Sequence, residues 1–128
     1  MIHEFVLDAS ALLAALHDEP GSDTVIPLLP RCTMSAVNWS EVVQKSLARG
    51  VNVAGMRDDI TSLGMTIAPL SAEDGELAAQ LWLETRARGL SLGDRACLAL
   101  ALRLKLPALT ADRAWASLKL PMKVRVIR

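Results

Sequence analysis

The chain has 128 residues, of which 52% are hydrophobic, and its formal net charge at pH 7 is zero. This length and composition predict one domain over residues 1–128 and exclude a disordered chain. The balanced charge argues against a protein that attracts nucleic acid or an anionic membrane through its overall electrostatic field. Because the apolar runs are short and no targeting segment begins the chain, we expect a cytoplasmic protein with no membrane partner.

Short apolar runs alternate with helical patterns along the whole chain. In order, the pattern predicts a strand over 2–7, a helix over 9–16, a short helix over 22–29, a strand over 32–34, helices over 36–49 and 53–63, a strand over 65–68, helices over 72–88 and 92–104, a strand over 108–110, a helical turn over 113–118 and an edge strand over 124–127. The helix over 92–104 is apolar on almost every side, which is typical of a helix at the centre of a domain. Alternating strands and helices predict an α/β domain, with helices on both faces of a mostly parallel sheet of four to five strands.

Four carboxylates occupy comparable places in this pattern. Asp8 and Asp112 each follow a predicted strand directly, Glu41 lies in the helix after another strand, and Asp94 stands in the first turn of the apolar helix. In open α/β sheets, ligand sites form at the carboxyl ends of the strands. We therefore expect these four side chains to converge at one edge of the sheet.

Each carboxylate also has an ordinary structural explanation. A lone Asp8 before a helix is most simply an N-cap. Asp94 comes three residues after Ser91, which is the spacing of a capping box. Glu41 comes four residues before Lys45, which is the spacing of an exposed ion pair on a helix. Capping and ion pairing explain the four residues less easily if all of them meet at one place.

A cluster of carboxylates has a chemical requirement of its own. Two unpaired carboxylates about 4 Å apart repel each other by roughly 4 kcal/mol at an effective dielectric constant near 20, so the cluster must hold protons or bind cations. Neither His3 nor His17 is placed to join it. A site with oxygen ligands alone favours Mg²⁺ or Mn²⁺ over zinc.

Four segments in order carry a resemblance to a known family. They are residues 8–10 (DAS) after the first strand, 35–42 (SAVNWSEV), 90–96 (LSLGDRA) and 109–115 (LTADRAW). Each segment is a weak pattern alone, but together they make the chain similar, from end to end, to the PIN-domain ribonucleases and most closely to the toxins of VapC type. The resemblance implies a PIN-like three-layer α/β/α fold.

The resemblance also implies an activity and partners. It implies a metal-dependent endoribonuclease that uses Mg²⁺ or Mn²⁺ to activate the water that attacks the RNA phosphodiester bond. It further implies a homodimer that acts as the toxin of a toxin–antitoxin pair and is neutralised by a cognate antitoxin protein.

Site residues carry over from the matching segments. Asp8 and Asp94 match the usual direct metal ligands, and Glu41 and Asp112 match acidic residues that bind metal directly or through water. The polar residues that match the surroundings of this acidic catalytic site are Ser10, Asn38, Ser91 and Thr110.

Two arginines and two other functions complete the predictions. Arg95 and Arg113 each follow a site aspartate, so they are candidates to contact backbone phosphates, with ion pairing or surface exposure as the alternative. The first alternative function is a non-catalytic PIN scaffold that binds a partner. The second is a receiver-like phosphotransfer domain, which would need a lysine at a late strand end where this chain has residues 110–112.

Overall fold

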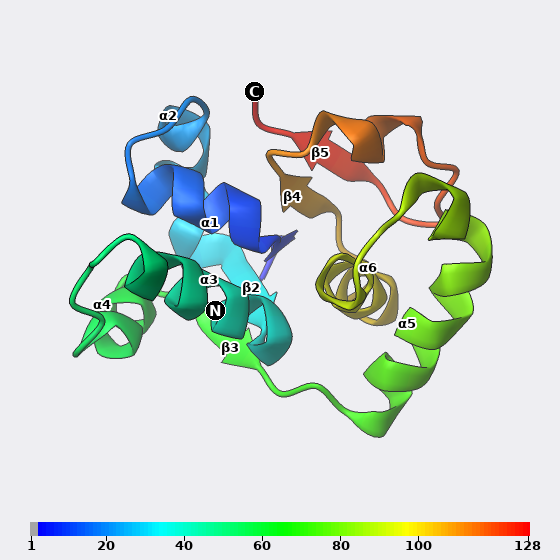
Figure 1. Cartoon of the computed structure of the whole chain (residues 1–128), viewed down its shortest axis with the longest axis horizontal. Coiled ribbons are helices and arrows are strands. Elements are labelled where there is room, and N and C mark those ends of the chain that lie inside the picture. Colours follow the sequence, from blue (N-terminus) through cyan, green and yellow to red (C-terminus); the bar gives the residue numbers. More distant parts are fainter. Residues whose placement is uncertain (1–2) are drawn as a thin grey trace.

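The computed structural model describes residues 3–128 as one β-sheet covered by helices on both faces (Figure 1). The strands are β1 (Phe5–Leu7), β2 (Cys32–Ser35), β3 (Thr66–Ala68), β4 (Ala108–Thr110) and β5 (Val124–Val126). Their order in the sheet is β3-β2-β1-β4-β5, and every pair is parallel. The predicted α/β/α fold is confirmed, and its sheet is parallel throughout.

Helices connect the strands and form the two outer layers. They are α1 (Ala9–Leu16), α2 (Ser22–Val25), α3 (Ala36–Ala48), α4 (Met56–Ser62), α5 (Ala72–Thr85) and α6 (Leu92–Leu104), with 3₁₀ turns η1 (Ile26–Arg31), η2 (Arg86–Arg88) and η3 (Arg113–Ser117). Within residues 3–128, none of these helices is long and apolar enough to cross a membrane.

Several predicted boundaries differ from the observed ones. The helix predicted over 53–63 begins only at Met56, and the helix predicted over 72–88 ends at Thr85 and continues as η2. The helix predicted over 22–29 is a short α-helix that continues as the 3₁₀ turn η1, which contains Pro27 and Pro30. Proline has no backbone N–H to donate within a helix, which explains why the regular α-helix stops. The first strand is observed from Phe5, and Ile2 of the predicted strand lies outside the described residues.

Two apolar clusters fill the space on either side of the sheet. One gathers side chains from α1, α2, β2 and α4, and the other gathers side chains from α5, α6 and η3. In α6, the six consecutive residues 96–101 are all buried. The prediction that this apolar helix stands at the centre of the domain is therefore confirmed, and its first turn reaches the edge of the sheet where strands end.

The helical pattern over 72–88 predicts Trp82 in the core, and this prediction is wrong. Its side chain is 45% exposed on α5, and the Arg86 guanidinium lies 5.2 Å from the centre of its ring. The buried stripe of α5 runs through Ala78, Leu81 and Thr85, which leaves position 82 at the rim of that stripe.

Candidate active site at the carboxyl ends of the strands

Asp8 lies in the loop between β1 and α1, at the N-cap position of α1, but its side chain makes no capping hydrogen bond. It is only 4% exposed. One carboxylate oxygen, Oδ2, accepts hydrogen bonds from the Ser10 hydroxyl at 2.6 Å and from the Thr110 hydroxyl at 2.9 Å. Asp8 therefore occupies the predicted N-cap position with its backbone, but its carboxylate faces β4 and does not cap the helix amides.

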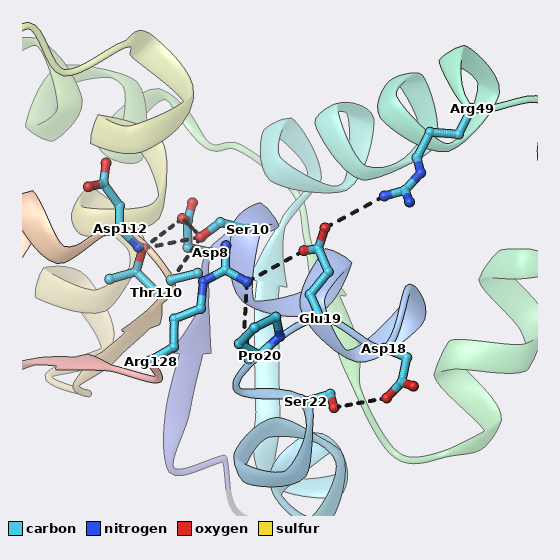
Figure 2. Close-up of polar contacts among 11 residues, drawn as sticks. Asp8, Ser10, Asp18, Glu19, Pro20, Ser22, Arg49, Thr110, Asp112 and Arg128 are labelled. Atoms are coloured by element: carbon cyan, nitrogen blue, oxygen red, sulfur yellow. Dashed lines mark hydrogen bonds and ion pairs between the residues drawn. The ribbon is translucent and has the colours of Figure 1, made fainter.

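Two neighbouring hydroxyls hold the same oxygen of this carboxylate (Figure 2). Ser10 accepts a hydrogen bond from the Ala111 amide at 2.9 Å, and Thr110 accepts one from the Asp112 amide at 3.0 Å. Their oxygens lie 3.2 Å apart. Each hydroxyl donates its single proton to the Asp8 carboxylate, which can only accept when it is ionised. Each hydroxyl oxygen in turn accepts from a main-chain amide, and this second bond fixes the position of the hydroxyl.

The pKa of Asp8 is raised to about 6. Burial is the largest cause, since it penalises the charged form. The hydrogen bonds from Ser10 and Thr110 lower this pKa, while the negative charges of Asp94 and Glu41 raise it further. Asp8, Glu41 and Asp94 are therefore near one another at this edge of the sheet, which is three of the four carboxylates that we expected to converge.

Glu41 projects from α3 toward the first turn of α6. Asn38, which is fully buried, donates from Nδ2 to Glu41 Oε1 at 2.9 Å and to the Gly93 carbonyl at 2.9 Å. A Cβ atom at position 93 would lie 2.5 Å from Glu41 Oε1, so the space for this carboxylate exists because residue 93 is glycine. Among residues 3–128, Glu41 forms no ion pair with Lys45, so that alternative is wrong.

Asp94 forms the capping box that the sequence predicted. The Ser91 amide donates to Asp94 Oδ2 at 3.0 Å, and the Asp94 amide donates to the Ser91 hydroxyl at 3.1 Å. One turn further along α6, Cys97 is completely buried. Its pKa is raised by burial and then by the charges of Asp8, Asp94 and Glu41. Cys97 thus lies in the interior near the three carboxylates, where its buried thiol is unreactive.

Asp112 is connected to the cluster through its backbone. Its amide binds Thr110, while its own carboxylate caps η3 by accepting from the Ala114 amide at 3.0 Å. In Figure 2 this carboxylate points away from Asp8. The structure therefore brings Asp112 to the same edge, but it does not turn the Asp112 side chain into the group formed by the other three.

The two candidate phosphate-binding arginines are engaged elsewhere. Arg95 donates to the Ala78 carbonyl at 2.8 Å, which joins α6 to α5. Arg113 is exposed and donates to the Arg128 carbonyl at 2.9 Å. Arg113 thus fits the surface-exposed alternative, and Arg95 bonds to a backbone carbonyl with no ion pair among residues 3–128. Contact with phosphate stays a prediction for both residues.

No set of three or more His, Cys, Asp or Glu side chains within residues 3–128 is arranged to hold a metal ion as it stands. The donor chemistry nevertheless fits a hard divalent cation. Each of the four carboxylates has one oxygen in a hydrogen bond and one without a hydrogen-bond partner among the described residues. The engaged oxygens belong to Asp8 (Oδ2), Glu41 (Oε1), Asp94 (Oδ2) and Asp112 (Oδ1).

These observations define an α/β/α domain whose parallel sheet presents acidic side chains at the carboxyl ends of its strands. The PIN domain family model matches residues 5–120. The chain therefore belongs to the PIN domain family. A comparison with curated proteins by sequence finds no match.

Solved structures with the same fold come from toxin–antitoxin systems. The chain is similar to a toxin–antitoxin complex from Klebsiella pneumoniae, with a TM-score of 0.76 and 19% identity over 98% of both chains. It is similar to DNA-bound VapBC from Salmonella typhimurium, with a TM-score of 0.73 and 17% identity over 99% of this chain and 100% of that chain. It is also similar to VapC20 from Mycobacterium tuberculosis, described as a sarcin-ricin loop cleaving toxin, with a TM-score of 0.71 and 16% identity over 91% of this chain and 97% of that chain.

The alternative of a receiver-like domain is wrong. Receiver domains of the CheY type have the sheet order 2-1-3-4-5. Here the order is β3-β2-β1-β4-β5, and the chain matches the PIN family model.

Proposed function

We propose that this chain is a metal-dependent endoribonuclease that acts as the toxin of a toxin–antitoxin pair. The observation that carries the proposal is the acidic edge of the sheet, where the charges of Glu41 and Asp94 raise the pKa of the buried Asp8 and each of the three carboxylates has an oxygen without a hydrogen-bond partner among the described residues. PIN membership and the toxin–antitoxin structures that share the fold support it.

Asp8, Glu41 and Asp94 would hold one or two Mg²⁺ or Mn²⁺ ions through these free oxygens, and Asp112, whose carboxylate caps η3, would contribute through water. A bound divalent cation would offset the charge of the scissile phosphodiester and lower the pKa of the attacking water. Without a cation the carboxylates would repel the RNA backbone, because both carry negative charge.

The surrounding polar residues position these carboxylates. Ser10 and Thr110 hold Asp8 with its Oδ1 atom free. Asn38 fixes Glu41 against the start of α6. A carboxylate that is held in place before the substrate arrives loses little freedom when it binds a cation, which favours a rigid catalytic site.

The partners follow from the same comparisons. Several structures with this fold are complexes of a toxin with its antitoxin, so we propose a cognate antitoxin protein as the partner that silences the nuclease. We also propose that the chain works as a homodimer in the cytoplasm, as the resemblance to VapC-type toxins implies.

The test is RNA cleavage by the purified chain with Mg²⁺ or Mn²⁺, with EDTA, and with the Asp94→Asn variant in parallel. We expect cleavage of structured RNA only with metal, and we expect its loss in Asp94→Asn, whose capping amide oxygen still allows α6 to form. Glu73→Gln changes an exposed carboxylate on α5 and is the matched control, expected to cut as the wild type does.

Metal-dependent cleavage that survives Asp94→Asn at the wild-type rate would show that the assigned site is wrong. Cleavage of no RNA, in a chain that does bind metal, would favour the non-catalytic PIN scaffold.

A further inference from the structure

A cavity of about 420 Å³ opens beside the acidic site. This volume lies within the roughly 300–1,000 Å³ of typical small-ligand pockets. Its lining residues come from α1, from the loop between α1 and α2, from the C-terminal end of α3 and from the segment after β5. They are Ser10, Leu13, Glu19, Lys45, Ala48, Arg49 and Arg128.

Ser10 belongs to both the cavity and the acidic site. Its hydroxyl binds Asp8 at 2.6 Å, and the same side chain lines the cavity. A molecule in the cavity would therefore lie next to the residues that hold the Asp8 carboxylate. Ser10 is the residue that the cavity lining and the acidic site share.

The two sides of Ser10 carry opposite charge. The acidic site has carboxylates, whereas the cavity has three cationic side chains against the single carboxylate of Glu19. The chain as a whole has no net charge, so this separation is a local feature. Phosphate groups are attracted to such a concave surface, because its cationic side chains outnumber the Glu19 carboxylate and a cleft with an excess of one sign of charge concentrates the field.

Glu19 holds two of the cations across the cavity (Figure 2). Its carboxylate lies 3.6 Å from Arg49 and 3.6 Å from Arg128. Arg128 also donates to the Pro20 carbonyl at 3.1 Å. Both ion pairs are partly exposed and therefore weak, and most of the guanidinium donors remain free to bind a planar anion.

Two further features suit a nucleotide unit. Lys45 forms no ion pair with any residue from 3 to 128, so its charge is available to a ligand. Leu13 and Ala48 supply an apolar wall on which a ribose can pack.

We propose that this cavity, the Ser10 cavity, binds a backbone phosphate of the RNA strand next to the phosphate that is cut. The inference rests on the proposed function for its substrate and adds a second contact point for that substrate. Arg49 and Arg128 bind the phosphate, and Glu19 is the anion that the phosphate displaces from the two guanidinium groups. This subsite recognises the backbone without reading the sequence, because phosphates carry no sequence information directly.

The test measures binding of a labelled single-stranded oligouridylate in the Asp94→Asn background across about 50 to 200 mM salt. The double variant Arg49→Gln/Arg128→Gln should bind more weakly. Its slope of log Kd against log salt should fall by about 0.7, because one phosphate of the single strand is no longer neutralised by the protein. Glu19→Gln should bind more tightly, since it removes a competing anion and keeps the side-chain shape.

Arg125→Gln and Arg57→Gln are the matched controls, because both arginines are exposed and lie outside the Ser10 cavity. Both controls should keep the wild-type slope. A double variant that also keeps the wild-type slope, or a Glu19→Gln variant with unchanged affinity, would overturn the subsite.

Metal-dependent cleavage by the wild-type chain is measured on the same preparation. Cleavage with an unchanged slope in the double variant overturns the subsite alone. A reduced slope in a chain that cuts no RNA supports the subsite and counts against the proposed nuclease.

Discussion

Asp8 combines a buried position with a negative charge, and the fold does little to neutralise it. No cation of residues 3–128 pairs with this carboxylate, and two hydroxyls are its hydrogen-bond donors. Hydroxyl donors compensate only part of the lost hydration of a buried charge. The raised pKa of Asp8 reflects this incomplete compensation of its charge. A bound divalent cation would stabilise the charged carboxylate and so lower that pKa.

The pH dependence of stability reports on Asp8. Its pKa is about 6 in the folded chain against 3.8 in the unfolded chain, so the folded state binds more protons between these values. The free energy of unfolding contributed by this group is highest below about pH 4 and falls as the pH rises through 6, by about 3 kcal/mol at most.

Asp8→Asn should remove this decline and make the chain more stable than the wild type near neutral pH in EDTA. Urea unfolding of both proteins across about pH 4 to 7 measures the difference. Parallel stability profiles for the two proteins would contradict the unfavourable burial of Asp8.

At the scale of elements, α5 and α6 are joined by an ion pair that the sequence pattern does not predict. Asp74 in the first turn of α5 is 1% exposed, and Arg103 from the last turn of α6 donates to both of its oxygens. Burial would raise the pKa of Asp74, but the hydrogen bonds and charge of Arg103, together with Ser71, bring it below its usual value. The two helices thus run antiparallel with a fixed register.

Breaking this pair should destabilise the fold without touching the acidic site. Asp74→Asn should lower the free energy of unfolding by about 2 kcal/mol, the range of hydrogen bonds to charged groups. Since the pKa of Asp74 is lowered in the folded chain, this stabilisation is present above the unfolded pKa and is lost as the pH falls through the folded one.

Urea unfolding with Asp74→Asn, Arg103→Gln and the double variant measures the coupling. Glu73→Gln, at the exposed neighbouring position, is the control and should change stability by less than about 0.5 kcal/mol. Additive effects of the two single variants would show that the pair contributes nothing.

For the whole molecule, periodicity and capping were enough to predict the strands, the buried helix and the edge where the carboxylates gather. These predictions succeeded because parallel strands that alternate with helices have few possible arrangements. In each arrangement the carboxyl ends of the strands lie at the same edge of the sheet. The direction of single side chains was not predictable. Asp8 turns to Thr110 through a contact between residues about 100 positions apart, which only the tertiary fold provides. Asp112 instead caps its own 3₁₀ turn through a local contact with the Ala114 amide, and the sequence pattern does not show which of the two roles its carboxylate takes.

The cationic cavity was missed for a similar reason. Glu19, Arg49 and Arg128 come from distant parts of the chain, and each reads as an ordinary surface charge in the sequence. Only the sheet order, which brings the end of β5 beside β4 and hence near α1, places them together.

The central claim is that the acidic edge binds a divalent cation, and calorimetric titration of the purified chain with Mn²⁺ tests it most directly. We predict saturable binding by the wild type that is abolished in Asp8→Asn and retained in the exposed control Glu73→Gln. Binding should also raise the thermal unfolding temperature of the wild type, because a ligand of the folded state stabilises it. A wild-type chain that binds no Mn²⁺, or an Asp8→Asn variant that binds it as well as the wild type, would contradict the account.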